Sequence, residues 1–165
     1  MDVLTRDHRE IETLLRNLMA NHSASLAGVL VASLVRHAIA EEEYVYPAVR
    51  DQVPGGERIA DRGLAQHAQV EETMQQIADT DTDDPDFDRL LVALEGEVRR
   101  HVHHDEDELF PKLRGACTRA DLAWLGERVA GTSTPYLERG SGNGSAGIIE
   151  EVRLALGARQ GAADT

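Results

Sequence analysis

A 15-residue segment occurs twice in this chain of 165 residues, at an offset of 64 residues. Residues 36–50 (RHAIAEEEYVYPAVR) align without a gap on residues 100–114 (RHVHHDEDELFPKLR). The two copies share Arg, His, Glu, Pro and Arg at matched positions, and elsewhere an acid matches an acid and an aromatic ring matches an aromatic ring. Residues 7–12 and 66–71 repeat more weakly. The chain is therefore expected to fold as two related hairpins.

Four stretches of the chain carry apolar residues at helical spacing, and they are rich in the strong helix formers Ala, Leu, Glu and Arg. Short, turn-like segments near residues 21, 53 and 80–86 separate them, which implies antiparallel neighbours. The sequence predicts an all-α fold, an antiparallel up-down-up-down four-helix bundle. The four predicted inward stripes are Leu4, His8, Ile11, Leu15 and Leu18; Leu30, Leu34, His37, Glu41, Tyr44 and Ala48; Ala60, Leu64, His67, Glu71, Met74 and Ala78; and Leu91, Leu94, Val98, His101, Asp105, Leu109, Lys112 and Leu113.

The C-terminal part of the chain differs from the bundle in composition. Residues 118–131 predict a short extra helix that covers the bundle through Leu122, Trp124, Leu125 and Val129. The bundle domain is therefore assigned to residues 1–131. Residues 132–165 are expected to form a Gly/Ser-rich linker and a flexible tail. A short helix over 148–156 is possible within that tail, either docked back on the bundle or used on a partner.

Composition and charge restrict the partners of the protein. The formal net charge of −13 repels phosphate backbones and anionic lipids, so no nucleic acid and no membrane partner is expected. The single cysteine, Cys117, cannot close an internal disulfide, which favours the reducing cytoplasm. We also expect no spanning helix, because no stretch approaches about 20 apolar residues, and the N-terminus lacks the order of a signal peptide.

Each stripe carries a histidine where a leucine is expected, and three stripes carry an acid four residues later. Residues at i and i+4 share one face of a helix, so these pairs point into one central volume. Buried carboxylates need a counter-charge, and a metal supplies it. Nitrogen and oxygen donors without a thiolate suit zinc, manganese or iron, and seven ligands are too many for one tetrahedral zinc. The candidate ligands are His8, His37, Glu41, His67, Glu71, His101 and Asp105, which fit two metal ions.

Other polar residues are interpreted as ordinary surface or core residues. His22 lies in a predicted loop, and His103, His104 and Glu12 lie beside the stripes, so all four are expected to face solvent. Glu71 is either a direct ligand or an acid that holds an imidazole by a hydrogen bond. A metal-free acidic helical bundle is the remaining alternative to a metal site.

The ordered set of residues resembles a haemerythrin-like protein of the HHE cation-binding domain family. The resemblance covers residues 1 to about 115 and rests on His8, His37-x3-Glu41 with Tyr46-Pro47, His67, and His101-x3-Asp105 with Phe110-Pro111. It implies two non-haem iron ions, bridged by carboxylates and an oxo or hydroxo group, that react with dioxygen, peroxide or nitric oxide. By the same resemblance, Glu41 and Asp105 bridge the irons, His8 and His37 serve one iron, and His67 and His101 serve the other, with one iron keeping an open position.

The sequence departs from the respiratory haemerythrin pattern at Glu71, where the third helix of that pattern offers a second histidine. An added carboxylate stabilises Fe(III), which disfavours reversible oxygen carriage. Asp105 replaces the Glu of most HHE domains and is a shorter bridging arm. Tyr44 is expected either to donate a hydrogen bond to an iron-bound oxygen or, more simply, to be a core aromatic residue.

Three functions follow from this interpretation. The first is a di-iron protein that binds or senses O2, H2O2 or NO. The second is an enzyme with catalase-like, peroxidase or NO-reducing activity at the same centre. The third is iron storage or buffering.

Overall fold

The computed structural model describes residues 1–132. These residues form helices joined by short turns, with no strand among them, which confirms the expected all-α class. The predicted linker and tail, with the possible helix over 148–156, lie outside the described residues from residue 133 onward.

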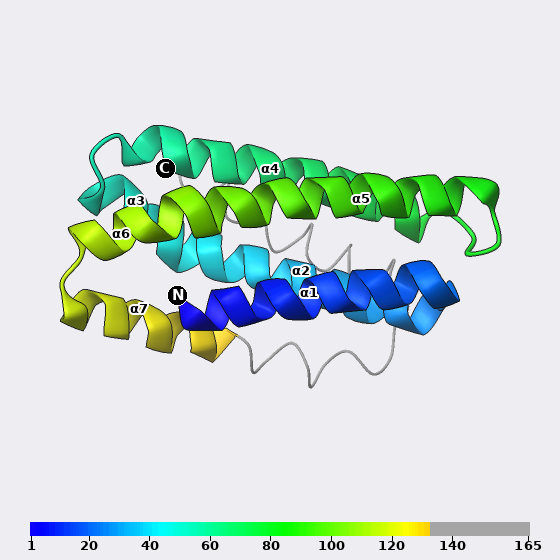
Figure 1. The fold of residues 1–165 in the computed structure, drawn as a ribbon, viewed down its shortest axis with the longest axis horizontal. Helices are drawn as coiled ribbons and strands as arrows, with labels where there is room; N and C mark the ends of the chain where they lie inside the picture. Colours follow the sequence, from blue (N-terminus) through cyan, green and yellow to red (C-terminus); the bar gives the residue numbers. More distant parts are fainter. Residues whose placement is uncertain (133–165) are drawn as a thin grey trace, which may run out of the picture.

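Four long helices lie side by side, and the chain reverses direction between α1 and α2 and between α4 and α5 (Figure 1). Helices α4 and α5 contact each other along their length, as do α1 and α2, and α1 also contacts α5. Two short helices, α3 and α6, continue α2 and α5 beyond a five-residue π-helical turn. The elements are α1 (Asp2–Asn21), α2 (Ala24–Ala40), η1 (Glu41–Val45), α3 (Tyr46–Gln52), α4 (Gly56–Ala78), α5 (Pro85–His104), η2 (Asp105–Leu109), α6 (Phe110–Ala116) and α7 (Arg119–Thr132).

Local sequence signals set the ends of the long helices. His22 ends α1 in the left-handed conformation, with φ 46°, and the Ser23 side chain accepts a hydrogen bond from the Leu26 N–H at the start of α2. The Asp84 side chain caps α5, and Pro85 follows at its first position. These short connections hold neighbouring helices in contact along their length.

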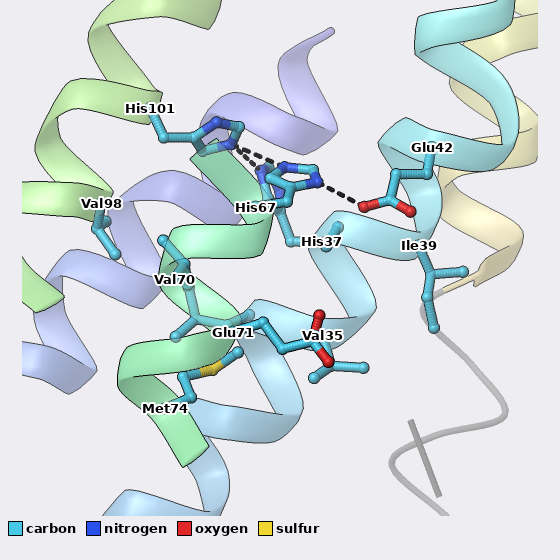
Figure 2. A pocket seen from close by; sticks show the side chains of 12 residues that line it. Val35, His37, Ile39, Glu42, His67, Val70, Glu71, Met74, Val98 and His101 are labelled. Carbon is cyan, nitrogen blue, oxygen red and sulfur yellow. Dashed lines mark hydrogen bonds and ion pairs between the residues drawn. The ribbon is translucent and has the colours of Figure 1, made fainter. Parts of the chain in front are cut away.

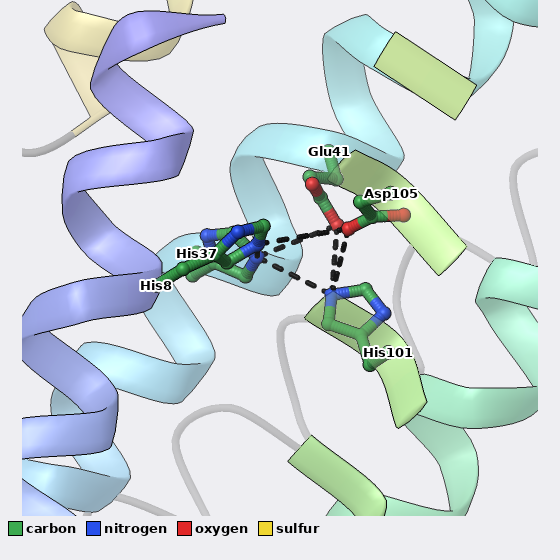
Figure 3. A group of neighbouring side chains, drawn as sticks. All are labelled: His8, His37, Glu41, His101 and Asp105. Atoms are coloured by element: carbon green, nitrogen blue, oxygen red, sulfur yellow. Dashed lines mark hydrogen bonds and ion pairs between the residues drawn. The ribbon is translucent and has the colours of Figure 1, made fainter. Parts of the chain in front are cut away.

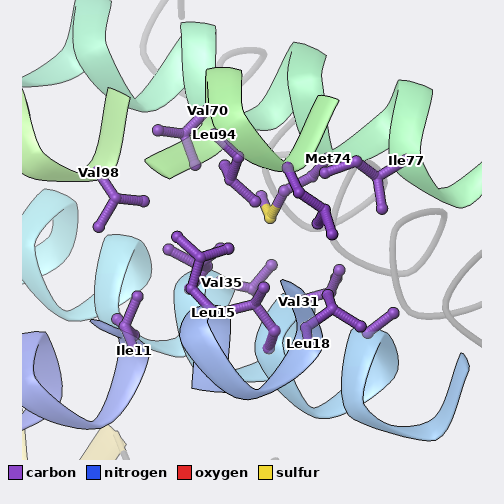
Figure 4. Close-up of a cluster of buried hydrophobic side chains, with 14 of the residues drawn as sticks. Ile11, Leu15, Leu18, Val31, Val35, Val70, Met74, Ile77, Leu94 and Val98 are labelled. Carbon is purple, nitrogen blue, oxygen red and sulfur yellow. The ribbon is translucent and has the colours of Figure 1, made fainter. Parts of the chain in front are cut away.

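Two apolar clusters fill the interior, and a polar layer separates them. One cluster lies toward the α1–α2 and α4–α5 connections and includes Leu15, Leu18, Leu94 and Met74 (Figure 4). The other is built around Tyr46, Phe110 and the inner face of α7. Along α1, Leu4 belongs to the second cluster and Ile11 to the first. His8 lies between them on the same face and is therefore in the polar layer.

The two π-helical turns shift the inward stripes by one residue. In an α-helix the stripe after Glu41 continues at residues 44 and 48, but here Val45 and Val49 are fully buried. After Asp105 the buried residues are Leu109 and Leu113, which agrees with the prediction, whereas Lys112 faces solvent. The extra residue in each turn rotates the following helix, so the predicted inward position of Lys112 is wrong, whereas Ala48 is partly buried and packs against the second cluster.

The predicted short extra helix over 118–131 is confirmed as α7 (Arg119–Thr132). Thr118 and Asp121 exchange hydrogen bonds at its start, in the manner of a capping box. Leu125 and Val129 pack on the second apolar cluster. Trp124 was expected to help cover the bundle, but its side chain is 51% exposed.

One stretch of the described chain, Ala24–Gln52, is long and apolar enough to cross a membrane by length and composition, because its most apolar 18-residue window has a mean hydropathy of 1.4. The expectation that no stretch reaches this threshold is wrong. The most apolar window of this stretch is 61% buried inside the protein. A core helix enclosed by its neighbours is apolar around most of its circumference, which explains the composition.

Candidate metal centre

Four imidazole rings from four different helices meet in the polar layer. His8 on α1, His37 on α2, His67 on α4 and His101 on α5 all turn Nε2 toward the same point. The Nε2 atoms of His8 and His37 are 3.1 Å apart, those of His37 and His101 are 3.3 Å apart, and those of His67 and His101 are 3.4 Å apart. Each histidine replaces a leucine on the inner face of its helix, so helix geometry alone brings the rings together.

Two buried carboxylates face these rings (Figure 3). Glu41 Oε2 lies 3.2 Å from His67 Nε2, 3.3 Å from His101 Nε2 and 3.5 Å from His37 Nε2. Asp105 Oδ2 lies 3.1 Å from His101 Nε2 and 3.7 Å from His8 Nε2. The donor atoms of five buried residues lie within 4.8 Å of one another, and these residues are His8, His37, Glu41, His101 and Asp105.

The donor set fits metal ions because it is not satisfied by the protein alone. Both carboxylate oxygens of Asp105 and the Oε1 atom of Glu41 are buried without a hydrogen-bond partner in the described chain. Two acids with no exposed surface and no lysine or arginine beside them are costly in a helical interior. Imidazole nitrogen and carboxylate oxygen are donors that iron, manganese and zinc accept. The residues present therefore fit a bound cation.

Burial and neighbouring charges shift the pKa values of several of these side chains in opposite directions. Burial lowers the pKa of His101 to about 4 and also lowers the pKa of His37. Burial opposes the charge on His67, but the hydrogen bonds that its ring donates to Glu41 and Glu42 outweigh burial and raise its pKa to about 9. Burial and the charge of Glu41 raise the pKa of the Asp105 carboxyl well above its usual range. Without a metal the cluster thus holds protons that a metal ion would displace on binding.

A second pair of acids holds two of the rings from outside. Glu106 Oε1 is 2.8 Å from His8 Nδ1, and Glu42 Oε1 is 2.7 Å from His67 Nδ1. Glu42 and Glu106 occupy the same position of the internal repeat. Such a contact fixes the ring with its proton on Nδ1 and leaves Nε2 free to donate its lone pair to a metal. Arg9 in turn donates to Glu106 at 2.6 Å.

Tyr46 is a residue of this centre that the sequence interpretation missed. Its fully buried hydroxyl donates to Glu41 Oε2 at 3.2 Å and lies 3.1 Å from His67 Nε2. Burial and the nearby charges of Glu41 and Asp105 raise its pKa, so the hydroxyl keeps its proton. Gly63 makes room for the ring, because a Cβ atom there would lie 2.5 Å from the Tyr46 oxygen. The aromatic position shared by the two repeats was the available signal.

The structure places Tyr44 away from the rings. Its hydroxyl donates to Glu43 at 2.9 Å, and its ring lies edge-on to Trp124 at 6.4 Å. The partly buried ring packs against the second apolar cluster, in agreement with the simpler expectation of a core aromatic residue. The π-helical turn is the reason: it moves residue 46, rather than residue 44, to the position one turn beyond Glu41.

Glu71 lies near the centre but not among the five clustered residues. It is partly exposed, one turn from His67 on α4, and makes no hydrogen bond or ion pair within residues 1–132. The acid that holds His67 by a hydrogen bond is Glu42 instead.

The remaining histidines divide between surface and core. His103 is exposed beside Asp107, as expected, and His22 is partly exposed beside Asp88. His104 was expected to face solvent, but it is buried, with Nε2 donating to the Ile59 carbonyl at 3.1 Å. This contact joins α5 to the start of α4, where the two helices pack closely, so the surface prediction for His104 is wrong.

A cavity of about 50 Å³ lies directly beside three of the rings (Figure 2). Its wall comes from α2, α4 and α5, with Glu42 of the π-helical turn at one side. The lining residues are Leu34, Val35, His37, Ala38, Ile39, Glu42, His67, Val70, Glu71, Met74, Val98 and His101.

Comparison with known proteins agrees with this geometry. Residues 1–113 match the family model described as the hemerythrin HHE cation binding domain. A crystal structure of a hemerythrin HHE cation binding domain-containing protein from Mycobacterium kansasii aligns with a TM-score of 0.72 and 22% identity, over 82% of this chain and 85% of that one. At this identity the likeness shows a common fold.

A curated relative is similar over part of its length. It is a DNA nickase from Nostoc sp. (strain PCC 7120), 27% identical over 117 residues that cover 68% of this chain and 33% of the nickase. The chain therefore spans about a third of the length of that relative.

Proposed function

The chain belongs to the hemerythrin HHE cation-binding domain family, and from this premise we propose that it is a non-haem di-iron protein that binds or senses O2, H2O2 or NO. The observation that carries the proposal is the meeting of four inward Nε2 atoms with two buried carboxylates, three of whose four oxygens lack a hydrogen-bond partner within residues 1–132. The proposal treats α1, α2, α4 and α5 as the antiparallel four-helix bundle that encloses the irons.

We assign the ligand roles by position. His8 and His37 serve one iron, His67 and His101 serve the other, and Glu41 and Asp105 lie between the two pairs. When bound, an iron pair supplies redox electrons and an open position for a small ligand. The protein supplies the rest: Glu42 and Glu106 orient His67 and His8, and the apolar clusters on either side exclude water.

The size and lining of the neighbouring cavity support a small ligand. A volume of about 50 Å³ accommodates a diatomic molecule or peroxide but no larger metabolite. The formal charge of −13 disfavours a phosphate backbone, so we do not extend the nickase's activity to this chain. The single cysteine supports a location in the reducing cytoplasm.

Metal analysis combined with an absorption spectrum tests the proposal. We expect two irons per chain and the near-ultraviolet bands of a bridged ferric pair in the protein loaded with ferrous salt under air. Addition of NO to the reduced protein is expected to give a stable adduct without turnover. A protein that takes up no iron, or only one ion per chain, would contradict the proposal. More than two irons per chain would point to storage.

A second candidate function is breakdown of peroxide or reduction of NO at the same centre. The Tyr46 hydroxyl favours it, because an O–H group beside Glu41 and His67 can donate a hydrogen bond to an oxygen or nitrogen atom that is being reduced. Steady oxygen evolution from peroxide, or steady consumption of NO, by the iron-loaded protein would select this candidate over the sensor.

A further inference from the structure

The two metal positions of the centre are built from repeat-related parts. His8 and His37 bring their Nε2 atoms within 3.1 Å of each other, and His67 and His101 bring theirs within 3.4 Å. We name these pairs the His8 position and the His67 position. The internal repeat matches His37 to His101, and the weaker repeat matches His8 to His67. The two positions are therefore expected to bind a cation alike unless their surroundings differ.

The acids that support one ring of each position are also placed alike. Glu106 Oε1 lies 2.8 Å from His8 Nδ1, and Glu42 Oε1 lies 2.7 Å from His67 Nδ1 (Figure 2 shows the second contact). The side chains of both acids are 23% exposed. Such a contact raises the basicity of the imidazole and strengthens the donation of its other nitrogen to a metal ion. By distance and exposure, the two supports are equal.

An arginine contacts only one of these two acids. Arg9 Nη2 donates to Glu106 Oε2 at 2.6 Å. Glu42 makes no ion pair with a lysine or an arginine within residues 1–132. In the weaker repeat, the residue that matches Arg9 is Ala68, which is exposed on α4. One support is therefore an ion pair without net charge, whereas the other is a carboxylate with a full negative charge.

Arg9 changes the charge of the support rather than its position. Glu42 keeps the same distance to its histidine as Glu106 does, without an arginine, so an arginine is not needed to hold such an acid in place. A guanidinium at 2.6 Å competes for the charge of the carboxylate. The carboxylate then polarises the Nδ1–H group of His8 less, and the ring becomes a weaker donor at Nε2.

Other acids on this part of α1 face a different cation. Arg36 Nη2 of α2 lies 3.5 Å from Asp7 Oδ1 and 3.8 Å from Glu10 Oε2. Within the described chain, neither acid contacts a nitrogen of His8. The charge that reaches the support of this ring by direct contact is therefore that of Arg9.

We propose that Arg9 makes the two metal positions unequal. Through Glu106 it weakens the donation of His8, so the first divalent cation binds at the His67 position. The cation at the His8 position binds more weakly and exchanges more readily. The inference rests on the proposed function, because it takes the same histidines as the ligands of two metal ions, and it adds the order in which the two positions fill.

Zinc titration of the metal-free full chain, labelled with ¹⁵N-histidine, tests the order of binding. Zinc accepts imidazole nitrogen and has no redox chemistry of its own, so the readout does not depend on iron. The Nε2 resonances of the His67 position are expected to shift as the first equivalent is added, and those of the His8 position as the second is added. Simultaneous shifts at both positions, or earlier shifts at the His8 position, would overturn the inference.

Variants that exchange the two matched residues test the role of Arg9. Arg9→Ala is expected to tighten the weaker zinc-binding step by about tenfold and to bring the two steps together. Ala68→Arg is expected to place a guanidinium beside Glu42 and to weaken the tighter step by a similar factor. The double variant should therefore reverse the order of filling. Calorimetry measures the two dissociation constants, and the histidine resonances assign them to positions.

Two further variants separate charge from structure. Arg9→Lys keeps a positive charge beside Glu106, so the order of filling is expected to stay that of the wild type. Arg16→Ala removes the same charge from α1, but this guanidinium contacts Thr13 instead of the support acid, so both zinc-binding steps should stay unchanged. Weaker zinc binding in Arg9→Ala would show that Arg9 only holds Glu106 in place. That result, or equal effects of Arg9→Ala and Arg16→Ala, would overturn the inference.

Failure of this inference can be told apart from failure of the proposed function. Two zinc ions that bind in an order unaffected by Arg9 would overturn the inference and leave the di-iron proposal intact. A chain that binds zinc in the expected order but takes up no iron would overturn the proposed function, and the difference between the two positions would stand.

Discussion

Each ring of the centre turns one nitrogen inward, and the surroundings of its other nitrogen differ between two pairs of residues. The Nδ1 atoms of His8 and His67 face carboxylates at 2.8 and 2.7 Å. The Nδ1 atoms of His37 and His101 are buried without a hydrogen-bond partner in the described chain. One ring of each pair assigned to an iron is therefore oriented by a carboxylate at Nδ1, and the other has no such contact at Nδ1 within residues 1–132.

Replacement of one of the packed rings tests whether the centre holds the fold together. His101→Ala is expected to lose iron and to lower the free energy of unfolding by roughly 3–5 kcal/mol, because Glu41 and Asp105 remain buried without the group between them. Metal analysis and chemical denaturation measure the two effects. His103→Ala, at an exposed position of the same helix, is the control and should change stability by less than about 0.5 kcal/mol. Unchanged metal content and melting temperature in His101→Ala would contradict the expectation.

The two nearby tyrosines give a matched pair of variants. Tyr46→Phe removes the donor to the buried carboxylate of Glu41 and is expected to cost about 1–3 kcal/mol in the metal-free protein. Tyr44→Phe, which alters a hydrogen bond near the surface, is expected to cost less than about 0.5 kcal/mol. Denaturation curves at one pH compare them. Equal costs for the two variants would be inconsistent with the position of Tyr46.

Sequence reasoning located most of the candidate residues but could not orient all of them. The i, i+4 pairs His37/Glu41 and His101/Asp105 meet in the structure because each histidine precedes a π-helical turn and each acid is the first residue of that turn. Tyr44 follows such a turn, and its expected position assumed an unbroken α-helix. Glu42 could not be recognised, because its contact with His67 joins two helices and leaves no periodic signal.

At the scale of elements, the two π-helical turns decide how each hairpin ends. Glu41–Val45 and Asp105–Leu109 occupy the same position of the internal repeat, and each is followed by an aromatic residue and a proline. Proline at the second position of the next helix has no N–H to donate, which makes a wider turn tolerable there. The repeat was visible in the sequence, but the extra residue within each turn was not. The residues of each turn have the composition of an ordinary acidic helix face, so nothing in the sequence distinguishes a π-helical turn from an α-helical one.

Removal of one residue from the second turn tests its role. Deletion of Asp107 is expected to restore α-helical spacing, rotate Phe110 and Leu113 out of the core and cost several kcal/mol, because two fully buried side chains lose their packing. Circular dichroism and thermal melting measure the loss. Asp107→Ala keeps the chain length and removes only an exposed ion pair with His103, so it is expected to stay close to the wild type. A deletion variant as stable as Asp107→Ala would refute the role assigned to the turn.

At the scale of the whole molecule, the interior is two apolar clusters divided by one polar layer, and the stability of the protein depends on what fills that layer. A metal ion that binds only the folded state adds stability in proportion to the logarithm of its concentration over its dissociation constant. Without a metal, protons occupy the same donors. The all-helical class and the short extra helix were predictable from periodicity, whereas the burial of His104 depends on how closely α4 and α5 pack.

The metal-free protein is expected to lose stability as the pH rises from about 6.5 to about 9. The pKa of His67 is about 9 in the folded protein, above its ordinary value of 6.5, so the folded state holds more protons in this window. The proton on His67 contributes roughly 3 kcal/mol to the free energy of unfolding. This contribution is complete below pH 6.5 and is lost as the pH rises to about 9. Melting temperatures in the presence of a chelator measure the profile. His67→Gln should flatten it, and a flat profile in the wild type would contradict the expectation.

The outer acids cross between the two halves of the chain. Glu106, from the second repeat, holds His8 near the N-terminus, and Glu42, from the first repeat, holds His67. Neither hairpin therefore contains all the donor residues together with the acids that orient them, because each hairpin provides the carboxylate that orients a histidine of the other. A chain cut between α3 and α4 would yield two fragments that are individually incapable of forming the centre, and the centre would return only when both fragments reassociate. The two related hairpins are therefore arranged like the two subunits of a symmetric dimer, joined here in one chain.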